Sequence, residues 1–379
     1  MSQVVLYFND LDNSIGKIIS DNISPCLMLI LSFSIWSYLF VNKTIYKENK
    51  SAKTKSGLFV DYVSQSQINK LQCRYSKQAF FTGLVMFFFA LKLLFSELVH
   101  KEVHDLELEV NNSNYFQSNL TARQILLPSR CLWAIACIFA GCTSSILVIL
   151  SYLVISTEIS WQNIKEGDHS MRIAATDNSQ ISLIASKMHG KSVFCLIRYI
   201  NRCIKSIKHV FILCSLLIFF AVFTLETTRM LLFIADNKNN LEVNQLNTSF
   251  VKVLNSFGFI NTSRMWFVNI PAALITLTSF LFAIISTSIL IISTKAENKI
   301  PNELFRISVS YKKARIVQTV GSWLFVIGPM LQVLLQSCVT NCPSVDFNHN
   351  AVYHVVIAVA SVLTSFTAIY MQVLSTKIC

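Results

Sequence analysis

Ionisable side chains inside long apolar runs are the residues of this chain whose types and spacing could do chemistry. Lys92 and Glu97 lie in one such run, and Glu226 and Arg229 lie three residues apart in another. Residues three apart share a helix face, so Glu226 and Arg229 could form an intramembrane ion pair. Charge within a bilayer is costly and often marks function. All four residues also lie in the outer third of their runs, where long side chains reach the interface. A helix-end anchor therefore stays open beside a ligand site or a structural ion pair.

The sequence carries no motif that is typical of catalysis or of metal binding. The tetrapeptide His189-Gly190-Lys191-Ser192 resembles the end of a phosphate-binding loop, but Ala185 stands where that loop needs its first glycine. The chain has no His-Glu-x-x-His, and its cysteines and histidines lack the spacing of a zinc site. We therefore expect no enzyme activity, no metal and no cofactor.

Apolar runs organise the chain. Each is close to the roughly 20 residues that a helix needs to cross about 30 Å of hydrocarbon. Of the 379 residues, 14% are charged, against about 25% in an ordinary soluble domain. The runs are continuous rather than alternating, which favours helices over a membrane barrel. We expect an all-α, multi-pass membrane protein with six or seven spans in a single domain of residues 1–379. The segments are at about 23–41, 79–99, 131–156, 207–233, 266–294, 317–337 and 351–376.

Lys and Arg gather in alternate loops, and this pattern predicts the orientation of the chain. The basic loops, with eight, seven and six Lys or Arg, are 42–78, 157–206 and 295–316. The other loops carry one, three, three and none, and they are 1–22, 100–130, 234–265 and 338–350. Basic loops stay in the cytoplasm, so the first group is predicted inside. The net charge of +12 is thus an orientation signal, and we expect no nucleic-acid partner.

Glycosylation triplets agree in part with this orientation. Four Asn-x-Ser/Thr triplets fall in the predicted outer loops, and their candidate glycosylation sites are Asn111, Asn119, Asn247 and Asn261. Asn42 and Asn49 begin two more triplets, in a loop that the charge pattern places inside. The motif is common by chance, so these residues give modest support to the orientation.

The sixth apolar segment, 317–337, has two interpretations. It contains polar and helix-breaking residues, which are Gly321, Gly328, Pro329, Gln332 and Gln336. Neighbouring helices must satisfy such groups if the segment crosses a bilayer. Otherwise the segment is a broken helix at the inner face. The choice decides whether the C-terminus lies inside or outside.

Seven segments with basic inner loops first suggest a G-protein-coupled receptor with its N-terminus outside. Two motifs of the main class of those receptors are missing. Ser156-Thr157-Glu158 stands where an Asp-Arg-Tyr triplet should end the third span, and the last span lacks Asn-Pro-x-x-Tyr. The first inner loop, 42–78, is also long for that class. A divergent seven-span chemoreceptor therefore remains one hypothesis.

The end of the last segment resembles another family. Residues 365–373 read Ser-Phe-Thr-Ala-Ile-Tyr-Met-Gln-Val. They resemble a signature of the insect gustatory receptors, which is Thr-Tyr, five apolar residues and Gln-Phe, with Gln372 identical. The stretches 331–335, 342–347 and 189–207 also look like segments of that family. The residues that correspond to the signature or would line a pore are Ser365, Phe366, Tyr370, Gln372 and Val373.

The resemblance implies a chemosensory receptor of the plasma membrane that binds a small-molecule ligand. Members of the family are ligand-gated cation channels, so it also implies a homo- or hetero-tetramer with related receptors, whose last helix lines the pore. The sixth segment would then be an inner-face anchor helix. One span of that family would be missing, because residues 1–22 are too polar to supply it. Hydroxyl side chains in 351–376 suit a pore and equally suit close helix packing. A membrane transporter is the third hypothesis.

Overall fold

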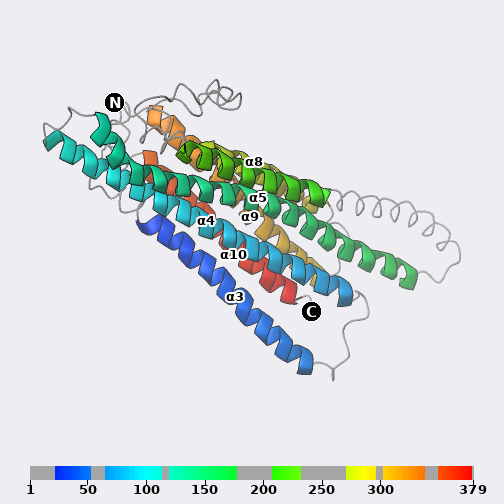
Figure 1. The fold of residues 1–379 in the computed structure, drawn as a ribbon. Helices are drawn as coiled ribbons and strands as arrows, with labels where there is room; N and C mark the ends of the chain where they lie inside the picture. Colours follow the sequence, from blue (N-terminus) through cyan, green and yellow to red (C-terminus); the bar gives the residue numbers. More distant parts are fainter. Residues whose placement is uncertain are drawn as a thin grey trace.

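The structure is a computed structural model that describes residues 22–52, 65–112, 119–176, 207–231, 270–295, 302–337 and 349–377. The described part of the chain is helical throughout. Six helices carry labels in Figure 1, and a seventh covers Ile207–Leu231. The labelled helices are α3 (Ser24–Ala52), α4 (Gln65–Asn112), α5 (Asn119–Thr176), α8 (Ile270–Lys295), α9 (Asn302–Ser337) and α10 (His349–Lys377).

Each described helix contains one stretch that is long and apolar enough to cross a membrane. The prediction of an all-α, multi-pass membrane protein is therefore confirmed. The helices α4 and α5 have 48 and 58 residues and run past their apolar stretches at both ends. The seven candidate spans are Ser24–Asn42, Asn69–Leu98, Cys131–Gln162, Ile207–Leu231, Ala273–Ile291, Val309–Leu331 and Ala351–Ser375.

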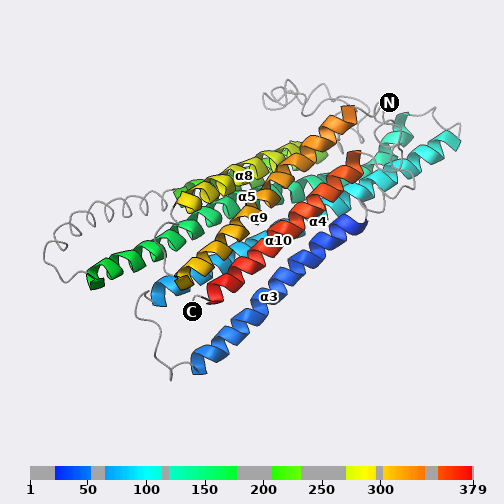
Figure 2. The same cartoon turned by 180° about the vertical axis from the view of Figure 1, so that it is seen from behind.

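Six of the helices form a closed ring. Along the chain, α3 packs on α4, α4 on α5, α5 on α8, α8 on α9 and α9 on α10. The ring closes because α10 also packs on α3 and α4, as the reverse view in Figure 2 illustrates. The helix over Ile207–Leu231 lies outside this ring against α5, where Phe211 contacts Tyr152.

The sixth apolar segment belongs to the ring. It lies in α9, a continuous helix of 36 residues that contains Pro329 without ending there. Gly321 and Gly328 lie where α10 comes closest, because a Cβ on Gly321 would stand 2.8 Å from Thr364 Oγ1. A Cβ on Gly328 would stand 3.0 Å from Ile357 Cδ1. The residues that looked like a helix break therefore let two long helices approach each other.

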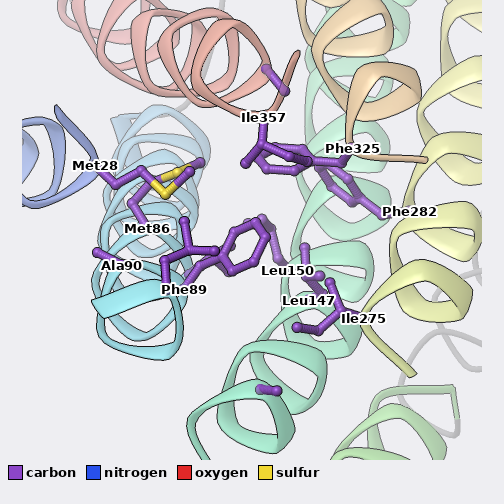
Figure 3. Packing of buried hydrophobic residues seen from close by; sticks show 14 of the residues in the cluster. Met28, Met86, Phe89, Ala90, Leu147, Leu150, Ile275, Phe282, Phe325 and Ile357 are labelled. Atoms are coloured by element: carbon purple, nitrogen blue, oxygen red, sulfur yellow. The ribbon is translucent and has the colours of Figure 1, made fainter. Parts of the chain in front are cut away.

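The middle of the ring is an apolar layer. Side chains from α3, α4, α5, α8, α9 and α10 meet there, and Figure 3 shows them from close by. Phe89 and Phe325 pack ring to ring with centroids 6.3 Å apart. This layer separates two groups of polar side chains, one toward each end of the bundle. The other labelled members of the layer include Met28, Met86, Leu147, Leu150, Ile275, Phe282 and Ile357.

Candidate functional site

A group of buried side chains joined by polar contacts lies toward the end of the bundle that the charge pattern places in the cytoplasm. We call it the inner polar cluster. It joins α5 to α9 and consists of Glu158, Trp161, Tyr311, Arg315 and Gln318.

An ion pair between α5 and α9 is the centre of this cluster. Arg315 Nη2 lies 3.7 Å from Glu158 Oε2, and both side chains are almost fully buried. Tyr311 donates its hydroxyl hydrogen to Glu158 Oε2 and accepts hydrogen bonds from Arg315 Nε at 2.9 Å and Nη2 at 2.7 Å. A buried charge is tolerated when its partners satisfy its hydrogen bonds, and these contacts supply them.

Two amides complete the hydrogen bonding of the pair. Arg315 Nη1 donates to Gln318 Oε1 at 2.6 Å, and Gln162 Nε2 donates to the free oxygen of Glu158 at 2.7 Å. Because Tyr311, Arg315 and Gln318 recur at spacings of four and three, they share one face of α9. That face is turned toward α5, so the inner ends of the two helices are held by polar contacts.

The neighbouring helices are tied to the same level. Arg74 of α4 donates to the backbone oxygen of Ser156 on α5 and to the hydroxyl of Ser160. Gln372 of α10 donates to Ser76 Oγ on α4 at 3.0 Å. Polar contacts at the inner end of the ring therefore join α4 to α5 and to α10, beside a buried cluster that includes Leu71, Met371 and Leu374.

A second group lies toward the opposite end of the ring, which the charge pattern places outside. We call it the outer polar cluster, and it consists of Lys92, Glu97 and His354. His354 Nε2 on α10 lies 3.7 Å from Glu97 Oε1 on α4. Lys92 interacts electrostatically with Glu97 and with the Cys137 thiol of α5. Lys92 is 7% exposed, so neighbouring side chains cover it.

Comparison with protein families, with curated proteins and with solved structures found no match to this chain.

Glu226 and Arg229 lie together on the helix that packs outside the ring. Arg229 Nη1 donates to Glu226 Oε1 at 2.8 Å, and both side chains are buried. One turn earlier on that helix, Val222 contacts α5 where a Cβ on Gly141 would stand 2.9 Å from Val222 Cβ. The pair thus lies one turn from a close contact of this helix with α5.

The residues that correspond to the gustatory-receptor signature lie on several sides of α10. Ser365 and Gln372 are buried, whereas Phe366 is 59% exposed and stacks on Tyr370 with ring centroids 5.8 Å apart. Val373 is half-buried. The hydroxyl side chains of α10 face into the protomer, because Ser361, Thr364, Ser365 and Thr367 are all buried.

The candidate glycosylation sites are not informative about the site. Asn111 and Asn119 lie at the end of α4 and the start of α5, on the predicted outer side. Asn247 and Asn261 lie outside the described residues, and so do residues 189–206 and 342–347 of the stretches that resemble the gustatory receptors. Within the described residues, no group of three or more His, Cys, Asp or Glu side chains has the arrangement of a metal site.

Sequence reasoning missed the inner polar cluster. In the sequence, Glu158 stands out only as a departure from a receptor motif, and Arg315 only as one of the charges that mark an inner loop. One signal was available, since Tyr311, Arg315 and Gln318 have helical spacing just before the sixth apolar segment. That spacing places three polar side chains on one face that enters the membrane, which requires polar partners on a neighbouring helix.

Proposed function

We propose that this protein is a seven-span chemosensory receptor that signals through its cytoplasmic face to a G protein. In this proposal a small-molecule or ionic stimulus acts at the outer end of the ring, in the plasma membrane. The inner polar cluster is the element that changes state. The observation that carries the proposal is the buried contact of Glu158 on α5 with Tyr311 and Arg315 on α9.

The course of α9 supports seven crossings. A helix that only anchored the chain at the inner face would not need 36 continuous residues packed between α8 and α10. With seven crossings and basic loops inside, the N-terminal end of α3 lies outside and the C-terminal end of α10 lies inside. This is the topology of the G-protein-coupled hypothesis.

The chemistry of the inner polar cluster supports a two-state element. An ion pair away from water is stable only while its geometry is complete, and its contacts break together when one partner leaves. Moving the inner end of α9 away from α5 would expose Glu158, Tyr311 and Arg315 to the cytoplasm, where water solvates them. The cluster therefore favours either a closed, dry state or an open, hydrated one, and a cytoplasmic partner could bind the second.

A ligand-gated cation channel is the second candidate, and the resemblance of residues 365–373 to the gustatory receptors favours it. The geometry adds a constraint on that candidate. The hydroxyl side chains of α10 are buried, so a pore between four protomers would need the exposed side of α10. That side carries Val359, Val362 and Phe366. The apolar layer in the middle of the ring also argues against an ion path within one protomer.

The proposal is tested by the basal activity of variants that open the inner polar cluster, because this test requires no known ligand. Arg315→Gln and Glu158→Gln remove one partner each, and the double variant Glu158→Gln/Arg315→Gln removes the pair without leaving an unpaired charge. The matched control is Glu226→Gln/Arg229→Gln, which removes a buried ion pair that does not connect α5 to α9. Second-messenger production and whole-cell current are measured together, with surface expression as the normalisation.

We expect the α5–α9 double variant to raise basal G-protein signalling several-fold and to leave the membrane current unchanged, while the control stays at the wild-type level. A rise in current without second-messenger production would instead favour the channel. Normal surface expression with neither response would contradict both candidates.

A further inference from the structure

The outer polar cluster contains a buried histidine that connects two helices of the ring. His354 on α10 is 2% exposed, and its Nε2 faces the Glu97 carboxylate of α4 at 3.7 Å. Its backbone oxygen accepts a hydrogen bond of 3.5 Å from Ser24 Oγ on α3. His354 therefore lies where α3, α4 and α10 meet, near the end of the bundle that the charge pattern places outside.

The ionisable groups near His354 determine how a proton on its imidazole would change the charge of the outer polar cluster. Within the described residues, Glu97 is the acidic group that faces it, and Lys92 is the cation next to Glu97. The other neighbours are the Cys137 thiol of α5, beside Lys92, and the Tyr353 ring, which contacts the imidazole edge-on with centroids 5.1 Å apart. A second proton on His354 adds one positive charge to the cluster and turns the His354–Glu97 contact into an ion pair.

The packing of the cluster restricts the ligands that can reach it. Lys92 is 7% exposed and the Glu97 side chain 11%, so these groups are covered by neighbouring side chains. A proton requires no cavity, and Glu97 retains the exposure through which it can arrive. Histidine is also the side chain that ordinarily changes charge between about pH 5 and 8, the range over which an external medium varies.

We propose that His354 and Glu97 form a proton-binding site, through which the protein detects the acidity of the outer medium. The detection step rests on the receptor function proposed above, whereas the binding site itself does not. Protonation adds a charge-assisted bond between α4 and α10 at the outer end. The next turn of α10 carries Ile357, which lies against Gly328 of α9. A shift of α10 is therefore passed to α9 by direct packing, and α9 carries Arg315 at its inner end.

Proton binding is measured on the purified full chain in lipid nanodiscs, with ¹⁵N-labelled histidine side chains observed by NMR. The signal that is lost in His354→Gln identifies the His354 imidazole. His209→Gln is the matched control, because His209 is exposed at the opposite end of the bundle. We expect the His354 signal to titrate between pH 8 and 5, and Glu97→Gln to change its midpoint. The proposed proton-binding site would be wrong if the His354 ¹⁵N signal stayed constant over this range. It would also be wrong if Glu97→Gln left the titration midpoint of that signal unchanged. If His354→Gln does not fold, the His354 signal is identified instead as the histidine ¹⁵N signal that shifts in Glu97→Gln.

Detection is measured separately, in cells whose external pH is changed from 7.5 to 6.0. We expect basal second-messenger production to change at least twofold in the wild type and in His209→Gln, and to become insensitive to external pH in His354→Gln and Glu97→Gln. If His354 titrates in nanodiscs but second-messenger production of the wild type does not depend on external pH, the proton-binding site is supported and its sensory role is contradicted. If the Glu158 and Arg315 variants also leave basal second-messenger production unchanged, the proposed receptor function is contradicted independently of the proton site.

Discussion

The indole ring of Trp161 stacks on the phenol ring of Tyr311 with centroids 4.9 Å apart and an interplanar angle of 22°. The first residue lies on α5 and the second on α9, and both are almost fully buried. On the same phenol, Arg315 lies 5.0 Å from the ring centroid, and the hydroxyl bonds Glu158. Tyr311 thus receives an aromatic, a cationic and an acidic contact, and its position fixes the distance between the inner ends of the two helices.

Replacing Trp161 should therefore lower stability in proportion to the ring area that is lost. Trp161→Ala leaves a cavity beside Tyr311, and we expect it to cost about 3–5 kcal/mol, as large-to-small core substitutions do. Trp161→Phe keeps a ring on Tyr311 and should cost about 1–2 kcal/mol. The check is the thermal unfolding midpoint of purified protein. Equal midpoints for the two variants would mean that the stack contributes nothing.

The close approach of α9 and α10 gives a second prediction. Gly321→Ala places a methyl group 2.8 Å from Thr364 Oγ1 and 3.3 Å from the backbone oxygen of Ala360, so the helices must separate. Overpacking of this kind costs about 1–3 kcal/mol. Val320→Ala is the matched control, since Val320 is the preceding residue and points outward with 48% exposure. We expect a lower unfolding midpoint for Gly321→Ala alone. A midpoint that is the same for both variants would contradict the packing.

The helical type of the chain and the positions of its apolar segments could be predicted from the sequence because length and hydropathy determine them. A run of about 20 apolar residues has few alternatives to a membrane helix. The sixth segment could not be decided in this way. Gly321, Gly328 and Pro329 favour a helix break in isolation, whereas the same small residues favour close packing when a partner such as α10 is present. Which of the two applies depends on the neighbour, and the neighbour is not visible in a single sequence.

The inner polar cluster could not be predicted for a related reason. Glu158 follows the third apolar segment, and Arg315 precedes the sixth, so both looked like ordinary charges of the inner loops. Their pairing arises because α5 and α9 are brought together by the ring, at a sequence separation that no local pattern records. Conversely, Glu226 and Arg229 are three residues apart, and helical spacing alone is sufficient to suggest their contact.

The contact of Glu226 with Arg229 gives a third prediction. Removing one partner leaves the other charged and buried, which typically costs about 3–5 kcal/mol. We therefore expect Arg229→Met to lower the thermal unfolding midpoint sharply. Glu226→Gln/Arg229→Met removes the stranded charge as well and should recover most of the loss. A double variant that is less stable than Arg229→Met would mean that the two side chains do not interact, because independent losses would add.

The last prediction concerns the side of the membrane on which the chain ends. If α9 crosses as its length and its place between α8 and α10 imply, an epitope placed after Cys379 lies in the cytoplasm. Antibody should then label permeabilised cells and leave intact cells unlabelled. A second epitope inserted in the loop 338–348, between α9 and α10, is the control for surface expression and should be labelled on intact cells. If α9 instead stayed at the inner face, the two results would be reversed, with Cys379 outside and the loop inside. That reversal would remove the topology on which G-protein signalling depends. It would favour the ligand-gated channel, because an inner-face anchor helix leaves the C-terminus outside.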